Sequence, residues 1–158
     1  MRIKGVTTLG SDKEVISINN GTDGVKQVDF VKISPHNNSN LFLSIVDNNQ
    51  HVKLYKIEDA NLQTYSSVEM NSNDLPTSGH IGCVSFGQNE NQILVTYTNY
   101  SETDGNIFLT TNGGQSWISK QGNIPDIPIR WVEFNPHDAD FKEVLIATEI
   151  GIYKTTDI

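Results

Sequence analysis

The sequence has 158 residues, with 19 Asp and Glu against 11 Lys and Arg, a formal net charge of −8 at pH 7 and an isoelectric point near 4.8. Such an acidic chain is poorly suited to bind phosphates, which argues against nucleic acid and against an anionic membrane surface as partners. The single cysteine, Cys83, excludes an internal disulfide framework, and no apolar run reaches the roughly 18 residues of a membrane-spanning helix. Residues 1–10 lack the apolar stretch of a signal peptide, so none is predicted and the compartment stays open.

Short stretches rich in Val, Ile, Phe, Tyr and Thr alternate with segments rich in Asn, Ser, Thr and Gly. The first composition is typical of strands and the second of tight turns, and no window of a dozen residues carries a helical apolar stripe. In chain order we predict strands at 13–18, 28–33, 41–46, 51–57, 64–70, 81–86, 92–98, 106–111, 116–119, 130–134, 143–148 and 151–155. Many short strands at this spacing indicate an all-β sandwich, barrel or propeller.

An internal repeat decides among these architectures. Residues 28–36 (VDFVKISPH) match residues 130–137 (RWVEFNPH), and residues 81–87 (IGCVSFG) fit the same pattern, with Ile33, Phe86 and Phe134 spaced by 53 and 48 positions. A second set of segments, 54–59, 107–112 and 152–157, aligns without gaps at spacings of 53 and 45. A period of this size that carries four strands is typical of a β-propeller blade.

The repeat predicts one all-β unit over residues 1–158, built of four-stranded antiparallel blades. We expect three blades, at about 28–70, 81–119 and 129–158, with strand 13–18 available to complete a blade. Closed propellers have four to eight blades, so three do not close a ring. Either two chains form a six-bladed homodimer, or these blades belong to a longer propeller; the sequence leaves both open.

The sharpest motif lies in the second repeat, where residues 110–117 (TTNGGQSW) follow the pattern S/T-x-D/N-x-G-x-S/T-W. In a hairpin of this kind Asn112 can accept loop N–H bonds and Gly114 permits a positive φ. Ser116 can bond back to the loop, and Trp117 can fold beneath it and bury a large apolar area. The third repeat reaches the same motif at Thr155 and Asp157.

These residues resemble the Asp-box of the BNR, or sialidase-type, repeat, and residues 135–157 are similar to repeats of xyloglucanase-type glycosidases. The resemblance extends over residues 28–158 and implies a propeller in which the motif is structural. We therefore assign a structural role to Thr110, Asn112, Gly114, Ser116, Trp117, Thr155 and Asp157.

The resemblance also implies that ligands bind at the opposite face, formed by the loops between the second and third strands and between successive blades. Glycosidases need two carboxylates across a cleft. The candidate catalytic acids in these loops are Asp47, Asp104, Asp126 and Glu149, and further candidates for ligand contact are Asp74, Tyr100 and Glu102.

No complete catalytic set is present. Sialidases hold their substrate carboxylate with three arginines, whereas this chain has only Arg2 and Arg130. The catalytic segment of xyloglucanase-type enzymes, Arg-Thr-Asp-x-Gly-Gly, has its nearest counterpart in residues 147–151, where the arginine is absent and Glu149 replaces the aspartate.

We therefore expect a non-catalytic propeller module, or part of a propeller, that recognises a glycan or a protein through its loop face. The alternative is a part of a glycoside hydrolase that uses carboxylate general acid/base catalysis. Neither hypothesis requires a cofactor. We predict no metal site, because the histidines show no metal-ligand spacing.

Overall fold

We analysed a computed structural model of the chain, which describes residues 2–3, 13–14, 16–18, 21–70, 72–100 and 105–158. Apart from one 3-10 turn, η1 (Ser72–Asp74), its regular elements are strands, and no helix of the described part is long and apolar enough to cross a membrane. The strands are β1 (Arg2–Ile3), β2 (Lys13–Glu14), β3 (Gln27–Ile33), β4 (Leu41–Val46), β5 (Val52–Glu58), β6 (Ser66–Glu69), β7 (Ile81–Phe86), β8 (Ile93–Tyr97), β9 (Ile107–Thr110), β10 (Ile118–Ser119), β11 (Ile129–Phe134), β12 (Val144–Thr148) and β13 (Gly151–Thr155).

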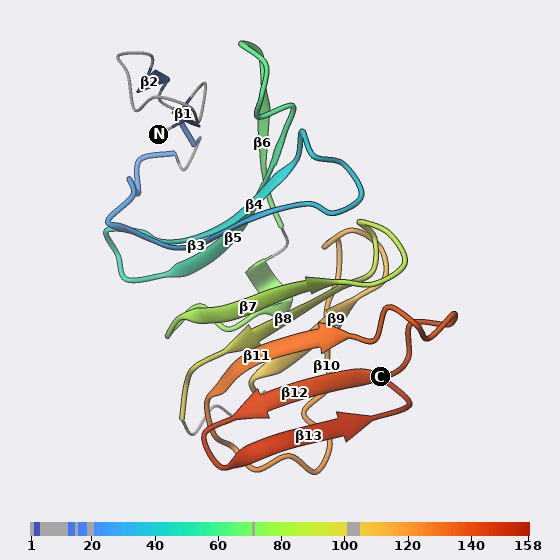
Figure 1. Cartoon of the computed structure of the whole chain (residues 1–158). Coiled ribbons are helices and arrows are strands. Elements are labelled where there is room, and N and C mark those ends of the chain that lie inside the picture. The colour runs from blue at the N-terminus through green and yellow to red at the C-terminus, as the bar shows by residue number, and fades with distance from the viewer. Residues whose placement is uncertain (1, 4–12, 15, 19–20, 71, 101–104) are drawn as a thin grey trace.

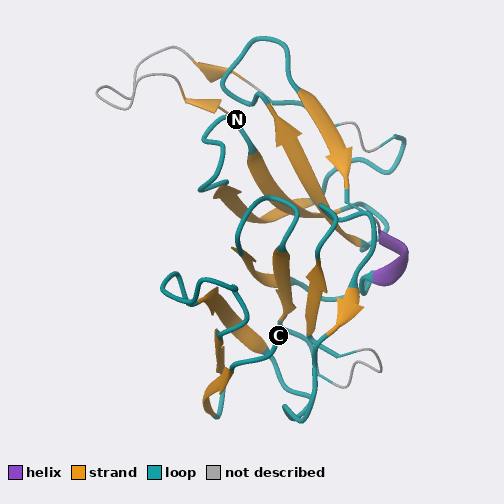
Figure 2. Ribbon diagram, turned by 90° about the vertical axis from the view of Figure 1, so that its right-hand side faces the viewer, coloured by secondary structure: helices purple, strands orange, loops and turns teal. Residues whose placement is uncertain are grey.

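Three antiparallel meanders follow one another along the chain. We call them blade one (β3-β4-β5-β6), blade two (β7-β8-β9-β10) and blade three (β11-β12-β13). They are stacked face to face, with blade one at the top of Figure 1 and blade three at the bottom, and Figure 2 shows the same stack from the side. This arrangement of successive blades is that of part of a β-propeller, so the predicted fold class is confirmed.

The predicted repeat is visible in the backbone. The first strand of each blade carries the same irregularity in its register, between Val28 and Phe30 in β3, between Ile81 and Cys83 in β7, and between Ile129 and Trp131 in β11. These positions are spaced by 53 and 48 residues, which are the spacings of the sequence repeat. Residues at matching places in two blades are called equivalent below.

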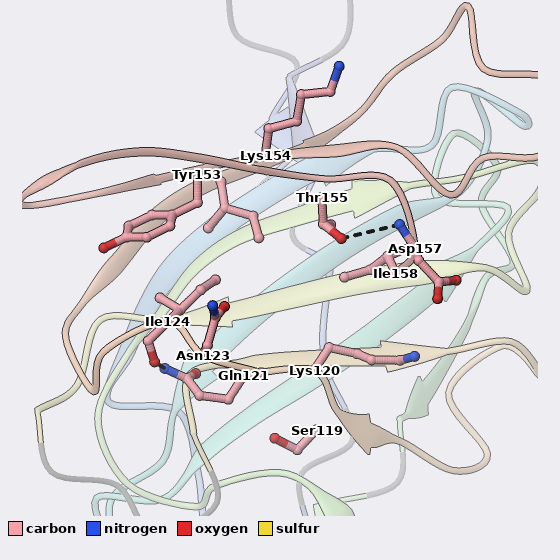
Figure 3. Close-up of a pocket in the computed structure, with 12 residues that line it drawn as sticks. Ser119, Lys120, Gln121, Asn123, Ile124, Tyr153, Lys154, Thr155, Asp157 and Ile158 are labelled. Atoms are coloured by element: carbon pink, nitrogen blue, oxygen red, sulfur yellow. Dashed lines mark hydrogen bonds between the residues drawn. The ribbon is translucent and has the colours of Figure 1, made fainter.

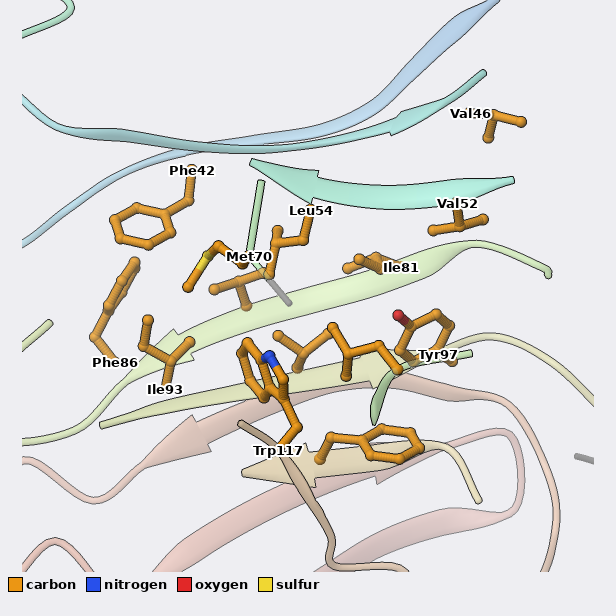
Figure 4. Close-up of a cluster of buried hydrophobic side chains, with 14 residues drawn as sticks. Phe42, Val46, Val52, Leu54, Met70, Ile81, Phe86, Ile93, Tyr97 and Trp117 are labelled. Carbon is orange, nitrogen blue, oxygen red and sulfur yellow. The ribbon is translucent and has the colours of Figure 1, made fainter. Parts of the chain in front are cut away.

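Each blade buries an apolar face against the next. One core, which includes Phe42, Leu54, Val84 and Val95, lies between blades one and two and is shown in Figure 4. A second core, which includes Leu94 and Val132, joins blades two and three. Because alternate residues of a strand point to opposite faces, Val95 packs toward blade one and its neighbour Leu94 toward blade three.

The first strands β3, β7 and β11 lie beside one another, and Lys32 of β3 connects all three. Its Nζ donates a hydrogen bond of 2.8 Å to the carbonyl oxygen of Val84 and lies 5.7 Å from the ring centroid of Phe86 and 5.9 Å from that of Trp131. A cation above two aromatic rings adds an electrostatic contact to the apolar packing.

The two outermost faces of the stack are apolar, and parts of both are exposed. On blade one, Val31 and Ile33 are each 58% exposed, although the equivalent Val84 and Phe86 of blade two are 0% and 6% exposed. On blade three, Ile152 is 76% exposed, whereas the equivalent Ile107 is fully buried. Several side chains whose equivalents face a neighbouring blade inside the stack thus face solvent at its two ends.

The N-terminal segment differs from the expectation that strand 13–18 completes a blade. β2 pairs with β1, while Ile16 and Ile18 pack on the outer face of blade one and the backbone N–H of Ser17 donates a 2.6 Å hydrogen bond to the Tyr65 hydroxyl. This packing shields apolar side chains on the outer face of blade one from solvent. Blade three has three strands in the described part of the chain.

We expect Trp117 to be the side chain on which the packing of blades one and two depends most. It is 6% exposed within their common core, so Trp117→Ala should lower the free energy of unfolding by about 3–5 kcal/mol, as truncation of buried aromatic side chains does. Urea denaturation measures this change. Trp131→Ala is the matched control: Trp131 is half exposed, and its loss should cost about 1 kcal/mol or less. Equal effects of the two substitutions would contradict this assignment.

Candidate functional site

One end of the stack is formed by the loops that we expected to bind a ligand. This loop face consists of residues 47–51, 75–80, 98–100, 105–106, 120–128 and 149–150, together with the first residues of β3, β7 and β11. Polar side chains from different blades meet there along the seams between blades. Two such seams carry hydrogen bonds between side chains of different blades.

At the seam of blades two and three, Tyr100, Arg130 and Glu149 form what we call the loop-face triad. The Tyr100 hydroxyl donates a hydrogen bond to one carboxylate oxygen of Glu149, and the Arg130 guanidinium pairs with the other. Tyr100 follows β8, Arg130 lies in β11 and Glu149 follows β12, so three separate elements supply the triad. The Tyr100 ring is 60% exposed and can be reached from solvent.

The triad keeps Glu149 ionised. The Tyr100 hydrogen bond and then the Arg130 charge hold the pKa of the Glu149 carboxyl below its usual range. In turn, the hydrogen bond to Glu149 raises the pKa of the Tyr100 phenol. At neutral pH the loop face therefore presents a carboxylate, a guanidinium and a neutral phenol side by side.

The buried side chain of Asn99 fixes the backbone on which Tyr100 is carried. The Asn99 side chain accepts a 3.3 Å hydrogen bond from the His80 backbone N–H and donates one of 3.0 Å to the Ser78 carbonyl. Gly79 sits directly against this side chain: an added Cβ would lie 1.6 Å from Asn99 Oδ1, and its φ is +87°. Only glycine fits such a close approach with a positive φ.

A second amide, Asn106, joins the same loops from the opposite side. Its Nδ2 donates to the carbonyl of Asn99 at 3.0 Å, to Asp126 Oδ1 at 3.2 Å and to the carbonyl of Ile127 at 3.3 Å. Asp126 thus lies at the loop face, where one of its carboxylate oxygens accepts a hydrogen bond from Asn106. The Gln121 side chain accepts a 2.7 Å hydrogen bond from the Asn106 backbone N–H.

The seam of blades one and two carries a hydrogen-bonded histidine–aspartate pair. His80 Nδ1 lies 2.7 Å from Asp29 Oδ2, with the histidine ring exposed and the carboxylate nearly buried. Asp29 comes from β3 and His80 immediately precedes β7. This pair links blade one to blade two, as the loop-face triad links blade two to blade three.

Asp47 is not an exposed loop acid, and this corrects the expectation drawn from its position. Its side chain is fully buried, and its Oδ1 accepts hydrogen bonds of 2.8 Å from the Asn49 N–H and 2.9 Å from the His51 N–H. Its Oδ2 lies 3.6 Å from Lys53 Nζ. Burial opposes ionisation, but these N–H groups and the charges of His51 and Lys53 outweigh it, so the pKa of Asp47 lies below its usual range. Asp47 stabilises its own hairpin.

Asp74 also lies away from the triad. Its carboxylate accepts a 3.0 Å hydrogen bond from the Trp117 backbone N–H. Asp74 lies in η1, on the connection from blade one to blade two, and the chain passes Trp117 before it reaches the loop face. Two other predicted residues, Glu102 and Asp104, lie outside the described residues.

The 110–117 hairpin is held together by hydrogen bonds among its own residues. The Thr110 hydroxyl accepts hydrogen bonds from the N–H groups of Asn112 and Gly114 at 3.3 and 3.0 Å, and Asn112 Oδ1 accepts one of 3.0 Å from the Ser116 N–H. The Asn112 Nδ2 group donates to the Ser116 hydroxyl at 2.8 Å. This hairpin joins β9 to β10, at the end of the blade opposite the loop face.

Among the described residues, no group of three or more His, Cys, Asp or Glu side chains is arranged to hold a metal ion. Cys83 is buried, and burial raises the pKa of its thiol, which disfavours the reactive thiolate.

Sequence reasoning missed the partners of the predicted residues. In the sequence, Arg130 matters only for the arginine count, which is too low for a sialidase. Nothing in the sequence distinguishes Asn99 and Asn106 from the other asparagines. The repeat held one usable signal: the first residues of β11 and the turn after β12 belong to one blade and meet at the loop face. The contact of Tyr100 with the next blade is a tertiary feature with no local signature.

Comparisons with known proteins support the fold. No family model matches the sequence, and no curated protein matches it. A crystal structure of the GH74 enzyme from Niastella koreensis matches 82% of this chain with a TM-score of 0.60 and 19% sequence identity. The match covers 21% of that enzyme, so this chain corresponds to about a fifth of its length. The likeness shows that the chain has the fold of part of this enzyme.

The structural role of Asp47 leads to a pH-dependent prediction. Asp47→Ala should lower the free energy of unfolding at pH 7 by about 1–3 kcal/mol, because two N–H groups of the turn lose their buried acceptor. Since the folded-state pKa is depressed, the ionic contribution is present above the ordinary value of 3.8 and is lost as the pH falls through the folded-state value. Asp47→Asn keeps an acceptor oxygen and should cost less. Urea titrations of both variants at pH 7 and pH 3 test this, and an equal loss for Asp47→Asn at the two pH values would contradict the ionic part.

Proposed function

We propose that this chain is a non-catalytic BNR-type propeller module that binds a glycan at the loop-face triad, with residues 110–117 as its Asp-box. The observation that carries the proposal is the triad itself: an exposed tyrosine ring held by a hydrogen bond, beside a paired guanidinium and carboxylate. Such a ring offers an apolar face to the C–H groups of a sugar, and the charged groups can bond its hydroxyls.

The state of the carboxylates favours binding over catalysis. A glycosidase needs one carboxylic acid whose pKa is raised, so that it can protonate the leaving group, and a second carboxylate across the cleft. Glu149 has the opposite property, since Tyr100 and Arg130 engage both of its oxygens and lower its pKa. Asp47 is buried and also has a lowered pKa.

The alternative function is participation in a glycoside hydrolase whose catalytic acids come from outside these blades. The likeness to a GH74 enzyme favours it, and the small share of that enzyme matched here is compatible with missing catalytic residues. The two functions differ in a direct observable, which is the release of reducing sugar.

The first test is binding of soluble β-glucan and xyloglucan oligosaccharides, measured by isothermal titration calorimetry. Tyr100→Ala should weaken binding about tenfold or more, as loss of a central aromatic contact does, and Arg130→Ala should weaken it because Glu149 loses its partner. Lys142→Ala is the matched control, since this exposed lysine lies at the opposite end of blade three. Affinity that is unchanged in the Tyr100 and Arg130 variants would overturn the proposal, and hydrolysis of the oligosaccharides would favour the alternative.

We also propose that two copies associate head to tail. The exposed face of blade one is equivalent to the faces that blades two and three bury, and the exposed face of blade three is equivalent to the opposite faces of blades one and two. A contact of the kind already made twice within the chain could therefore form between copies. Two copies give six blades, which is within the range of closed propellers.

Light scattering on a sizing column tests this association. We expect a mass near twice 17.6 kDa, and Val31→Glu or Leu145→Glu should return the chain to a monomer because each places a charge in an apolar contact. Val68→Glu is the control, since Val68 is about as exposed but lies on the outer strand β6. A monomeric unsubstituted chain would contradict the dimer and favour further blades as the natural cover of these faces.

A further inference from the structure

The seam of blades one and two contains a carboxylate that is held in the same way as Glu149. The Gln27 side-chain amide donates a hydrogen bond to Asp29 Oδ1, and His80 Nδ1 lies 2.7 Å from Asp29 Oδ2. The Asp29 side chain is 8% exposed, whereas that of His80 is 57% exposed. A nearly buried carboxylate needs such partners, and the ring that supplies one of them reaches into solvent.

The Asp29 carboxylate also fixes the hydrogen-bonding role of the His80 ring. An ionised carboxylate can only accept hydrogen bonds, so His80 Nδ1 carries the proton that lies between the two side chains. In a neutral imidazole, a proton on Nδ1 leaves a lone pair on Nε2, which then acts as an acceptor. His80 therefore presents an oriented acceptor and an apolar ring face to solvent at the loop face.

The backbone that carries His80 is cross-linked to the backbone that carries Tyr100. The Thr98 N–H and hydroxyl donate hydrogen bonds of 3.0 and 3.4 Å to the His80 carbonyl. The Asn99 side chain accepts the His80 N–H and donates to the Ser78 carbonyl. Tyr100 directly follows Asn99, so one hydrogen-bonded unit carries both exposed rings.

This unit is anchored to the segments on either side of it. The Val52 N–H of blade one donates a 2.8 Å hydrogen bond to the Thr77 carbonyl, at the beginning of the unit. On the other side, the Gln121 side chain accepts the backbone N–H of Asn106, whose own amide supports the unit. Figure 3 shows the Gln121 amide beside Ile124, to whose carbonyl it donates at 3.0 Å. The fold therefore sets the positions of both rings before any ligand binds.

The two rings reach toward opposite seams of blade two. Tyr100 contacts Glu149 of blade three, and His80 contacts Asp29 of blade one. Packed sheets lie about 10 Å apart, so about one blade thickness separates the two ring sites. A single sugar unit can contact one ring, whereas an extended oligosaccharide can contact both.

We infer that the His80 ring is a second glycan subsite and that the loop face binds an extended, uncharged oligosaccharide across blade two. The inference rests on the proposed function, because the Tyr100 site is the first subsite. At His80 a sugar hydroxyl donates to Nε2, and sugar C–H groups pack on the ring face. An anionic sugar is disfavoured, because Arg130 is already paired with Glu149 and Asp29 adds another carboxylate.

Calorimetry with linear β-glucan fragments of two lengths tests the second subsite. A ligand that spans two connected subsites gains affinity over one that fills a single subsite. We expect a hexasaccharide to bind the unsubstituted chain about tenfold or more tightly than a disaccharide, and His80→Ala to reduce this ratio to about threefold or less. His137→Ala is the matched control and should keep the ratio, since this exposed histidine follows β11 at the end of blade three opposite the loop face.

Substitution of Asp29 tests whether the orientation of the His80 ring matters. Asp29→Ala removes the acceptor of the Nδ1 proton and should lower the affinity ratio several-fold, whereas Asp29→Asn keeps an acceptor oxygen and should retain most of it. Circular dichroism and the urea midpoint establish that each variant is folded. A ratio that is unchanged in Asp29→Ala would count against the inference, because it would make the paired ring an incidental surface feature.

Imidazole resonances in NMR spectra report contact at His80 directly. Addition of the hexasaccharide should shift the ring signals of His80 and leave those of His137 in place. The inference is overturned if the His80 signals do not move, or if His80→Ala has the same affinity ratio as the unsubstituted chain. Binding that then still depends on Tyr100 would leave the proposed function intact, so the two failures are distinguishable, and absence of all glycan binding would overturn both.

Discussion

Burial of one blade's apolar face against the next determines the rest of this structure. A sheet of four short strands has two faces, and in blade two both are apolar, since Val95 and Leu94 are adjacent in β8 and fully buried on opposite sides. Such a sheet is stable only between two others. The stacking in turn fixes the first strands side by side, where Lys32 can reach rings in both following blades. The neighbouring positions of β3, β7 and β11 and the gathering of loops at the loop face are both consequences of this stacking.

The cores between blades are apolar, whereas the loop face is polar. Its hydrogen bonds between side chains of different blades lie at the seams. Tyr100 of blade two reaches Glu149 of blade three, and His80 at the start of blade two reaches Asp29 of blade one. A site made in this way depends on the correct placement of neighbouring blades, because neither blade alone holds both partners. The side-chain amides of Asn99 and Asn106 fix the local geometry of these loops. The Asn99 amide bonds to two backbone groups of the loop before β7, and the Asn106 amide bonds to backbone groups of two different loops.

The sequence predicted the blades because a propeller repeats one local pattern. Periodicity of two within strands, turn residues between them and a spacing near 50 between repeats are all local or translational signals, and the irregularities at Val28, Ile81 and Ile129 recur at that spacing. The site was less accessible, because burial and partners are decided across blades. Asp47 has the sequence context of an exposed turn, yet its side chain is buried, because its Oδ1 accepts two N–H groups of the turn itself. Strand 13–18 has the composition of a blade strand, yet Ile16 and Ile18 serve as a cover for blade one.

The two outer faces of the stack are covered to different degrees by the described residues. On blade one, Ile16 and Ile18 pack against the outer face, whereas on blade three Ile152 of that face is 76% exposed. Apolar burial is nondirectional, so such faces determine how strongly blades pack and carry little geometric selectivity. Hydrogen bonds and paired charges require one orientation of their partners, and across the described blades they are concentrated at the seams of the loop face. The apolar cores therefore set the spacing of the blades, and the seams convert that spacing into a defined arrangement of polar groups.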